Sequence, residues 1–175
     1  MTDLLTTLVL GGARSGKSAF AERMIADSNL APVYLATATA GDEEMKDRIA
    51  HHRSRRGPGW TTVEEPLALI DALAQVSQPG RAVLVDCLTL WLSNLMHAGA
   101  DIDEATDALL QSLDGYASPV VFVSNEVGLG IVPETALGRA FRDAQGRLNM
   151  RMAERADRVI LMAAGLALIM KDRPR

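Results

Sequence analysis

Residues 11–18 constrain the fold more than any other segment, because they contain the complete pattern G-x-x-x-x-G-K-[ST]. They are Gly11, Gly12, Ala13, Arg14, Ser15, Gly16, Lys17 and Ser18. A strand-like apolar run, 4–10, precedes them and a helix-like segment, 17–27, follows. In that setting the glycines let successive N–H groups point at phosphate oxygens, and the helix N-terminus attracts the same anion. A glycine turn with an incidental lysine would need neither flanking element, so the segment is interpreted as a phosphate-binding loop. Lys17 is expected to reach the β- and γ-phosphates and Ser18 to bind Mg²⁺.

The size and net charge of the chain further narrow the class of protein. The chain has 175 residues, 48% of them hydrophobic, which suits one domain over residues 1–175. Its net charge of −4 gives no general attraction to nucleic acid or to an anionic membrane. The longest uncharged apolar run, 159–170, is too short to span a bilayer and resembles two short strands around Gly165. We expect a cytoplasmic protein with no membrane span and no nucleic-acid partner, in which Cys87 is a small buried hydrophobe.

Strand-like and helix-like segments alternate along the chain. Strands are expected at 4–10, 33–36, 82–85 and 120–123, with a short edge strand at 60–63. Helices are expected at 17–27, from 42 to the histidine pair, and at 66–75, 88–96, 102–113 and 135–156, the last broken or bent near Gly146. This alternation predicts an α/β fold with a mostly parallel central sheet and helices on both faces, binding ligands at the carboxyl ends of the strands.

Asp86 directly follows the strand 82–85 and therefore belongs to the same edge of the sheet as the phosphate loop. In phosphate-loop proteins an acidic residue at such a position lies near the Mg²⁺ that the loop hydroxyl binds. The alternative is an aspartate that caps the helix beginning near Leu88. The presence of the loop favours the metal site.

His51 and His52 lie in a basic cluster at the end of an expected helix. At 100° per residue, Met45, Ile49 and His52 share one stripe of that helix, so His52 faces the protein and His51 faces elsewhere. A histidine at a phosphate site can attack a phosphoryl group, and nearby arginines would favour its neutral form and stabilise the developing charge. Phosphate binding without covalent chemistry, or a solvated basic helix end, are the alternatives.

The segment 124–133 follows a strand and contains two glycines and a terminal proline. It is either a loop of the active edge or a plain connection between strand and helix. Its Asn125-Glu126-Val127-Gly128 stretch does not match the N-K-x-D motif with which GTPase switches read guanine.

Several segments together resemble one family. They are the phosphate loop, the helix with the histidine pair, the segment 125–133, and Phe141-Arg142-Asp143 followed by Gly146-Arg147-Leu148-Asn149. In this order, over nearly its whole length, the chain resembles the bifunctional adenosylcobinamide kinase/adenosylcobinamide-phosphate guanylyltransferase of cobalamin biosynthesis. The resemblance implies a three-layer P-loop NTPase fold similar to that of recombination ATPases. It also implies a homotrimer with nucleotide bound near a subunit boundary.

The resemblance implies two reactions on one chain. The aminopropanol hydroxyl of adenosylcobinamide is phosphorylated with ATP or GTP. GMP from GTP is then transferred to that phosphate, which releases pyrophosphate and gives adenosylcobinamide-GDP. In the family a histidine of the pair carries the guanylyl group. We carry that role to His52, which agrees with its place on the inward stripe of the helix.

The remaining site residues are also implied by the resemblance. The phosphate loop would bind the triphosphate with Mg²⁺, and Arg53, Ser54, Arg55 and Arg56 would hold GMP or phosphate beside the nucleophile. The residues at the end of the second strand, which would line the site, are Ala36, Thr37 and Ala38. Glu64 and Asp86 would complete the nucleotide and metal surroundings, although Glu65 is adjacent and could replace Glu64. The chain departs from the family pattern at Met150, where a glutamine is expected, and in the more basic character of 53–56.

Overall fold

The computed structural model describes residues 6–38 and 59–173. Its centre is a seven-stranded sheet with the strand order β3-β2-β4-β5-β1-β6-β7. All neighbouring strands are parallel except β6 and β7, so the expected mostly parallel sheet is confirmed. The strands are β1 (Thr7–Gly11), β2 (Ala31–Ala36), β3 (Thr61–Glu64), β4 (Arg81–Asp86), β5 (Val120–Asn125), β6 (Arg158–Ala163) and β7 (Leu166–Asp172).

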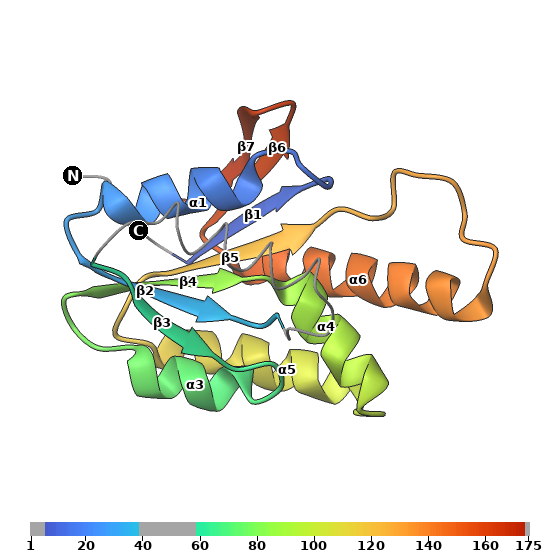
Figure 1. Ribbon diagram of the computed structural model, residues 1–175, viewed down its shortest axis with the longest axis horizontal. Helices are drawn as coiled ribbons and strands as arrows, with labels where there is room; N and C mark the ends of the chain where they lie inside the picture. Colours follow the sequence, from blue (N-terminus) through green and yellow to red (C-terminus); the bar gives the residue numbers. More distant parts are fainter. Residues whose placement is uncertain (1–5, 39–58, 174–175) are drawn as a thin grey trace.

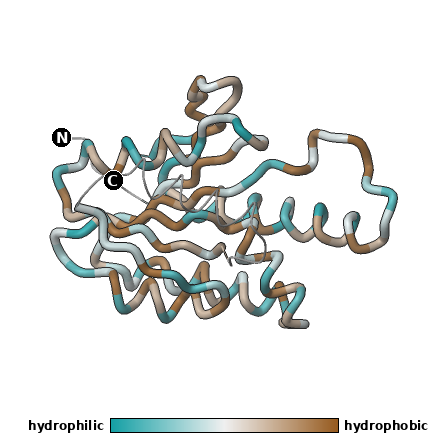
Figure 2. The backbone as a smooth tube through the Cα atoms, in the orientation of Figure 1, coloured by the Kyte–Doolittle hydropathy of each residue, from teal (hydrophilic) through white to brown (hydrophobic). Residues whose placement is uncertain are grey.

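Helices cover both faces of this sheet, which gives three layers (Figure 1). Helix α1 (Lys17–Ala26) lies on one face, and on the other lie α3 (Leu69–Val76), α4 (Leu88–His97), α5 (Ile102–Ser112) and α6 (Ala136–Arg155). A 3₁₀ turn, Leu113–Gly115, follows α5. The inner strands are apolar along most of their length (Figure 2), as expected for parallel strands buried on both faces.

Successive side chains along each strand point to opposite faces of the sheet, which divides the hydrophobic core into two clusters. Val9 and Val121 pack on the α1 side with Ile25, whereas Leu8 and Phe122 pack on the side of the other four helices. A residue's position in a strand therefore tells which layer its side chain faces. Cys87 is buried in the α1-side cluster, as the sequence predicted.

Two features of the helices differ from the sequence expectation. Helix α3 begins at Leu69 rather than near Pro66, because the Glu65 carboxylate accepts hydrogen bonds from the backbone N–H groups of Leu67 and Ala68 and holds the chain in a turn. Helix α6 is one uninterrupted helix of 20 residues, so the expected break near Gly146 is wrong, and the other option, a bend, stays a prediction. The glycine costs the helix about 1 kcal/mol relative to alanine. Burial of Leu148 and Met152 stabilises the helix beyond it.

Other expectations are met. β3 is the edge strand of the sheet, and residues 159–170 form the hairpin of β6 and β7 around Ala164 and Gly165. Within the described ranges no helix is long and apolar enough to cross a membrane.

The carboxyl ends of β1 to β5 lie at one edge of the sheet, with β5 between β1 and β4. The phosphate loop and Asp86 therefore lie on either side of β5.

Candidate functional site

The phosphate loop connects β1 to α1. Gly16, at a φ of 93°, occupies the N-cap of α1, and no side chain caps the helix. The outer part of the loop, which consists of Gly12, Ala13 and Arg14, is exposed, whereas Ser15 and Lys17 are buried. A helix N-terminus without a side-chain cap, preceded by a left-handed glycine, is suited to binding an anion with backbone N–H groups.

Close packing on β6 explains Gly11 of the loop, whereas Gly16 is explained by its positive φ. A Cβ on Gly11 would lie 2.4 Å from Oγ of Ser15 and 2.6 Å from the carbonyl oxygen of Met162. Gly165, in the turn between β6 and β7, donates its N–H to the Ser15 carbonyl at 3.1 Å. A Cβ on Gly16 would lie 3.5 Å from the Cα of Gly165. The loop is thus supported from the side by the C-terminal hairpin.

Lys17 is folded over this loop. Its side chain is 8% exposed, and Nζ donates to the carbonyl oxygen of Gly12 at 3.0 Å. The ammonium group therefore lies against the loop backbone to which phosphates would bind. Ser18, next along α1, is half-buried.

Asp86 lies at the end of β4 on the same face as α1. Its Oδ2 accepts a hydrogen bond of 3.0 Å from the hydroxyl of Tyr34, which belongs to the α1-side cluster. The N-cap of α4 is Cys87 and no side chain caps that helix, so the alternative role of Asp86 as a helix cap is not observed. Tyr34 fixes one carboxylate oxygen and leaves the other available to a ligand.

The pKa of Cys87 depends on charges from both sides of the site. Burial raises the pKa of its thiol to about 11, the Asp86 carboxylate acts in the same direction, and the Lys17 ammonium acts in the opposite direction. Lys17 and Asp86 are therefore close enough to act on one buried group, although Lys17 begins α1 and Asp86 ends β4.

The end of β2 borders Asp86, since Ala36 pairs with Asp86 in the sheet. Ala36 is buried and Ala38 is half-buried. The Thr37 hydroxyl is committed inside the protein: it donates to the Cys87 carbonyl at 2.7 Å and accepts from the Cys87 N–H at 2.9 Å. Thr37 therefore connects β2 to the residue after Asp86, and its hydroxyl is not directed at a ligand.

Among the predicted site residues that the structure describes, Glu64 lies farthest from the phosphate loop. It is exposed at the end of β3, the edge strand. At about 4.8 Å per strand, it lies roughly 10 Å from Asp86 and roughly 20 Å from Gly11. Glu65, the alternative to Glu64, uses its carboxylate to cap the turn before α3. The predicted residues His51, His52, Arg53, Ser54, Arg55 and Arg56 lie outside the described residues.

Asn125 was not assigned a site role from the sequence, yet the sheet places it between the two halves of the site. It pairs with Gly11, and Val123 on the same strand pairs with Asp86. Since Val121 and Val123 face α1, Asn125 belongs to that face as well. A polar residue ending a buried strand was the available signal, but its meaning depends on the strand order.

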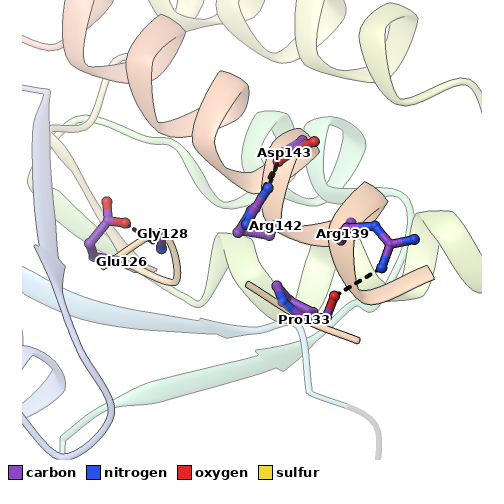
Figure 3. Close-up of polar contacts among 6 residues, drawn as sticks. All are labelled: Glu126, Gly128, Pro133, Arg139, Arg142 and Asp143. Carbon is purple, nitrogen blue, oxygen red and sulfur yellow. Dashed lines mark hydrogen bonds and ion pairs between the residues drawn. The ribbon is translucent and has the colours of Figure 1, made fainter. Parts of the chain in front are cut away.

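The loop that follows Asn125 extends away from the sheet alongside the start of α6 (Figure 1). Figure 3 shows its polar contacts: Glu126 accepts from the Gly128 N–H at 2.6 Å, and Arg139 donates to the Pro133 carbonyl at 3.0 Å. Arg142 pairs with its neighbour Asp143. Apolar side chains stand out from this loop, with Ile131 97% exposed.

A mostly parallel sheet with a phosphate loop after β1 and an acidic residue at the end of β4, the two strands being separated by one strand, defines a P-loop nucleotide-binding protein. Solved structures of this class are similar in fold. The RadB recombinase aligns with a TM-score of 0.52 at 17% identity, covering 98% of this chain and 82% of that one. A type III secretion system ATPase of pathogenic bacteria aligns with a TM-score of 0.56 at 10% identity, covering 94% and 56%. The fold expected from the resemblance to recombination ATPases is thereby confirmed.

Within this class the chain belongs to the cobinamide kinase/cobinamide phosphate guanyltransferase family, whose sequence model matches residues 7–170. It is 50% identical to the bifunctional adenosylcobalamin biosynthesis protein CobP of Pseudomonas aeruginosa, over 95% of this chain and 98% of that protein. It is 41% identical to the bifunctional adenosylcobalamin biosynthesis protein CobU of Escherichia coli, over 94% and 98%. The family resemblance of the sequence motifs is confirmed.

Proposed function

We propose that this chain carries out both reactions of its family. It phosphorylates adenosylcobinamide with ATP or GTP, and it then transfers GMP from GTP to the new phosphate to give adenosylcobinamide-GDP and pyrophosphate. The observation that carries the proposal is the pairing of a complete phosphate loop with Lys17 folded over it, in a chain that matches the family from residue 7 to 170.

In the kinase step the substrate hydroxyl attacks the γ-phosphorus, the bond to the β,γ-bridging oxygen breaks, and the hydroxyl proton passes to solvent. Such a transfer needs positioning and charge stabilisation more than covalent chemistry. The backbone N–H groups of the loop and the ammonium of Lys17 are the groups that stabilise the negative charge on the β- and γ-phosphates.

Ser18 and Asp86 would hold Mg²⁺ beside the phosphates. A hydroxyl and a carboxylate are the oxygen ligands that this cation prefers, and the bond from Tyr34 leaves one Asp86 oxygen available. When bound, Mg²⁺ would neutralise charge on the phosphate oxygens.

In the guanylyl transfer we assign the nucleophile to His52. A neutral imidazole nitrogen attacks the α-phosphorus of GTP, the bond to the α,β-bridging oxygen breaks, and pyrophosphate leaves with Lys17 stabilising its charge. A phosphate oxygen of adenosylcobinamide phosphate then attacks the same phosphorus and releases the histidine. Arg53 to Arg56 hold the GMP group, and the end of β2 with Glu64 contributes to the nucleotide surroundings.

We further propose that the protein acts as a homotrimer in the cytoplasm on small-molecule substrates. Exposed apolar side chains on β7 and on the loop after β5 support burial against other copies, since monomers rarely expose contiguous apolar surface. They include Leu129, Ile131, Val132, Leu166 and Leu168. Sedimentation of the protein at micromolar concentration tests this assembly, and a monomer would contradict it.

Labelled GTP tests the covalent mechanism. The protein is incubated with Mg²⁺ and GTP labelled at the α- or at the γ-phosphate, denatured, and assayed for acid-labile label. We expect label from the α-phosphate only, lost in His52→Ala and retained in His51→Ala, which removes the neighbouring imidazole. Label that persists in His52→Ala would overturn the assignment. No label, in protein that still phosphorylates adenosylcobinamide, would indicate a plain kinase without the transferase step.

A further inference from the structure

The end of β5 separates the phosphate loop from Asp86, so its position sets the spacing of the site. Gly11 pairs with Asn125 on one side of β5, and Asp86 pairs with Val123 on the other. Any displacement of the last residues of β5 therefore changes the distance between Lys17 and Asp86. Active-site geometry tolerates little such change, because a misplacement of about 1 Å can cost about a hundredfold in rate.

Three elements hold the backbone at this point. The Asn125 N–H donates to Oγ1 of Thr89 on α4 at 2.8 Å, and the Glu126 N–H donates to the Gly11 carbonyl of the phosphate loop at 3.0 Å. The third contact comes from α6, where Nδ2 of Asn149 donates to the Asn125 carbonyl at 3.0 Å. The peptide between Asn125 and Glu126 is thus fixed on both sides by hydrogen bonds.

Asn149 is itself oriented by buried partners. Its Oδ1 accepts from the Ser124 hydroxyl at 2.7 Å and from Nε2 of Gln145 at 3.0 Å. Nε2 of Gln145 also donates to Oγ of Ser124 at 2.9 Å. Ser124 and Gln145 are fully buried and Asn149 is 5% exposed, so no contact of this cluster is a loose surface contact.

Joining α6 to β5 through the polar cluster of Ser124, Gln145 and Asn149 lowers the stability of the fold relative to apolar packing. Among the residues that the structure describes, Oε1 of Gln145 has no hydrogen-bond partner, and burying such an acceptor costs about 1–3 kcal/mol. Apolar side chains at these three positions would join α6 to β5 without that cost. What they could not supply is a donor to the Asn125 carbonyl at the edge of the site.

We propose that Asn149 is a positioning residue for the nucleotide site. Its Nδ2 donor fixes the peptide between Asn125 and Glu126, and through the bond from Glu126 to Gly11 it fixes the phosphate loop relative to Asp86. The inference rests on the proposed function, because it assigns a purpose to the geometry of the proposed triphosphate site. Asn149 does not contact the reacting groups.

The test measures binding of MgGTP to the intact protein by calorimetry across pH 5.5–8. Asn149→Ala removes the donor, and we expect affinity to fall about tenfold at every pH, as for other residues that orient a binding group. Asn149→Asp keeps the acceptor toward Ser124 and Gln145 and donates to Asn125 only when protonated. Burial and the facing carbonyl raise the pKa of such a carboxyl. Its affinity relative to the unaltered protein therefore recovers as the pH is lowered.

Ser118→Ala is the matched control. Ser118 is also a buried polar residue that joins two chain segments, since it accepts from the Gln78 N–H at 2.9 Å and donates to the Gln78 carbonyl at 2.8 Å, but it precedes β5 at the opposite edge of the sheet. We expect it to lower stability without changing affinity for MgGTP.

Two results would overturn the proposal: an Asn149→Ala variant that binds MgGTP as tightly as Ser118→Ala, or an Asn149→Asp variant whose relative affinity does not depend on pH. Lys17→Ala separates this failure from that of the proposed function. If Lys17→Ala binds MgGTP normally, the phosphate site itself is wrong; if it loses binding while both Asn149 variants retain it, only the positioning role is wrong.

Discussion

Replacing Thr37 by valine should lower the stability of the protein more than the small change in side-chain shape suggests. The side chain is fully buried, and its hydroxyl makes two hydrogen bonds to Cys87, one to the carbonyl and one from the N–H. Valine has nearly the same shape but offers neither bond. The change therefore tests the polar link between β2 and the residue after Asp86, apart from packing.

The two bonds do not contribute equally. The Cys87 carbonyl keeps a second partner, since it also accepts from the Trp91 N–H at 3.2 Å. Losing one of its two bonds costs about 1 kcal/mol. The Cys87 N–H is left buried and unpaired, which costs about 1–3 kcal/mol. We therefore expect Thr37→Val to lower the free energy of unfolding by about 2–4 kcal/mol.

Urea unfolding followed by circular dichroism measures this loss, with the slope of the transition checked for constancy. Thr37→Ser is the control, because it keeps the hydroxyl and loses one methyl group, at a cost of about 1 kcal/mol. A valine variant that is as stable as the serine variant would refute the reasoning, because the two hydrogen bonds would then contribute no more than one methyl group.

Three further changes address the site itself. Lys17→Ala should lower kcat/KM for the triphosphate about a hundredfold or more in a steady-state kinase assay, because it removes a preorganised charge; an unchanged value would contradict the phosphate-loop assignment. Tyr34→Phe releases one oxygen of Asp86 and should raise the Mg²⁺ concentration for half-maximal rate about tenfold, measured by titration at saturating nucleotide. Because burial raises the pKa of Cys87 from 9.0 to about 11, the unfolded chain loses this proton first, and stability should fall by up to roughly 3 kcal/mol between those pH values. Cys87→Ala should remove that part of the pH dependence of urea unfolding.

The parts of the fold that depend on local sequence were predictable. The phosphate loop, the strand that ends in Asp86 and the helix at 102–113 each follow from patterns within a few residues. The alternation of strands and helices also gave the parallel sheet and its two helical layers. The break expected at Gly146 was wrong because tertiary burial of Leu148 and Met152 outweighs a local glycine penalty of about 1 kcal/mol.

The site was less predictable, because it depends on which strands are neighbours. No pattern at 120–125 shows that β5 lies between β1 and β4, and so Asn125 had no assigned role. The inward orientation of the Thr37 hydroxyl depends on Cys87, which lies far along the chain. Glu64 and Glu65 are adjacent residues of the same type, so the sequence does not distinguish their roles. Only the structure shows that the Glu65 carboxylate caps the turn before α3.

The position of β1 has a consequence for the order in which the protein can assemble during synthesis. β1 is made before the other six strands of the sheet, yet its partners are β5 and β6, and its loop is supported by the turn that contains Gly165. The nascent chain therefore holds β1 and the phosphate loop without their neighbouring strands until β5 and β6 have left the ribosome. Ribosome-bound chains stopped before β5 should bind no triphosphate, and competence should appear only when β6 and its turn emerge.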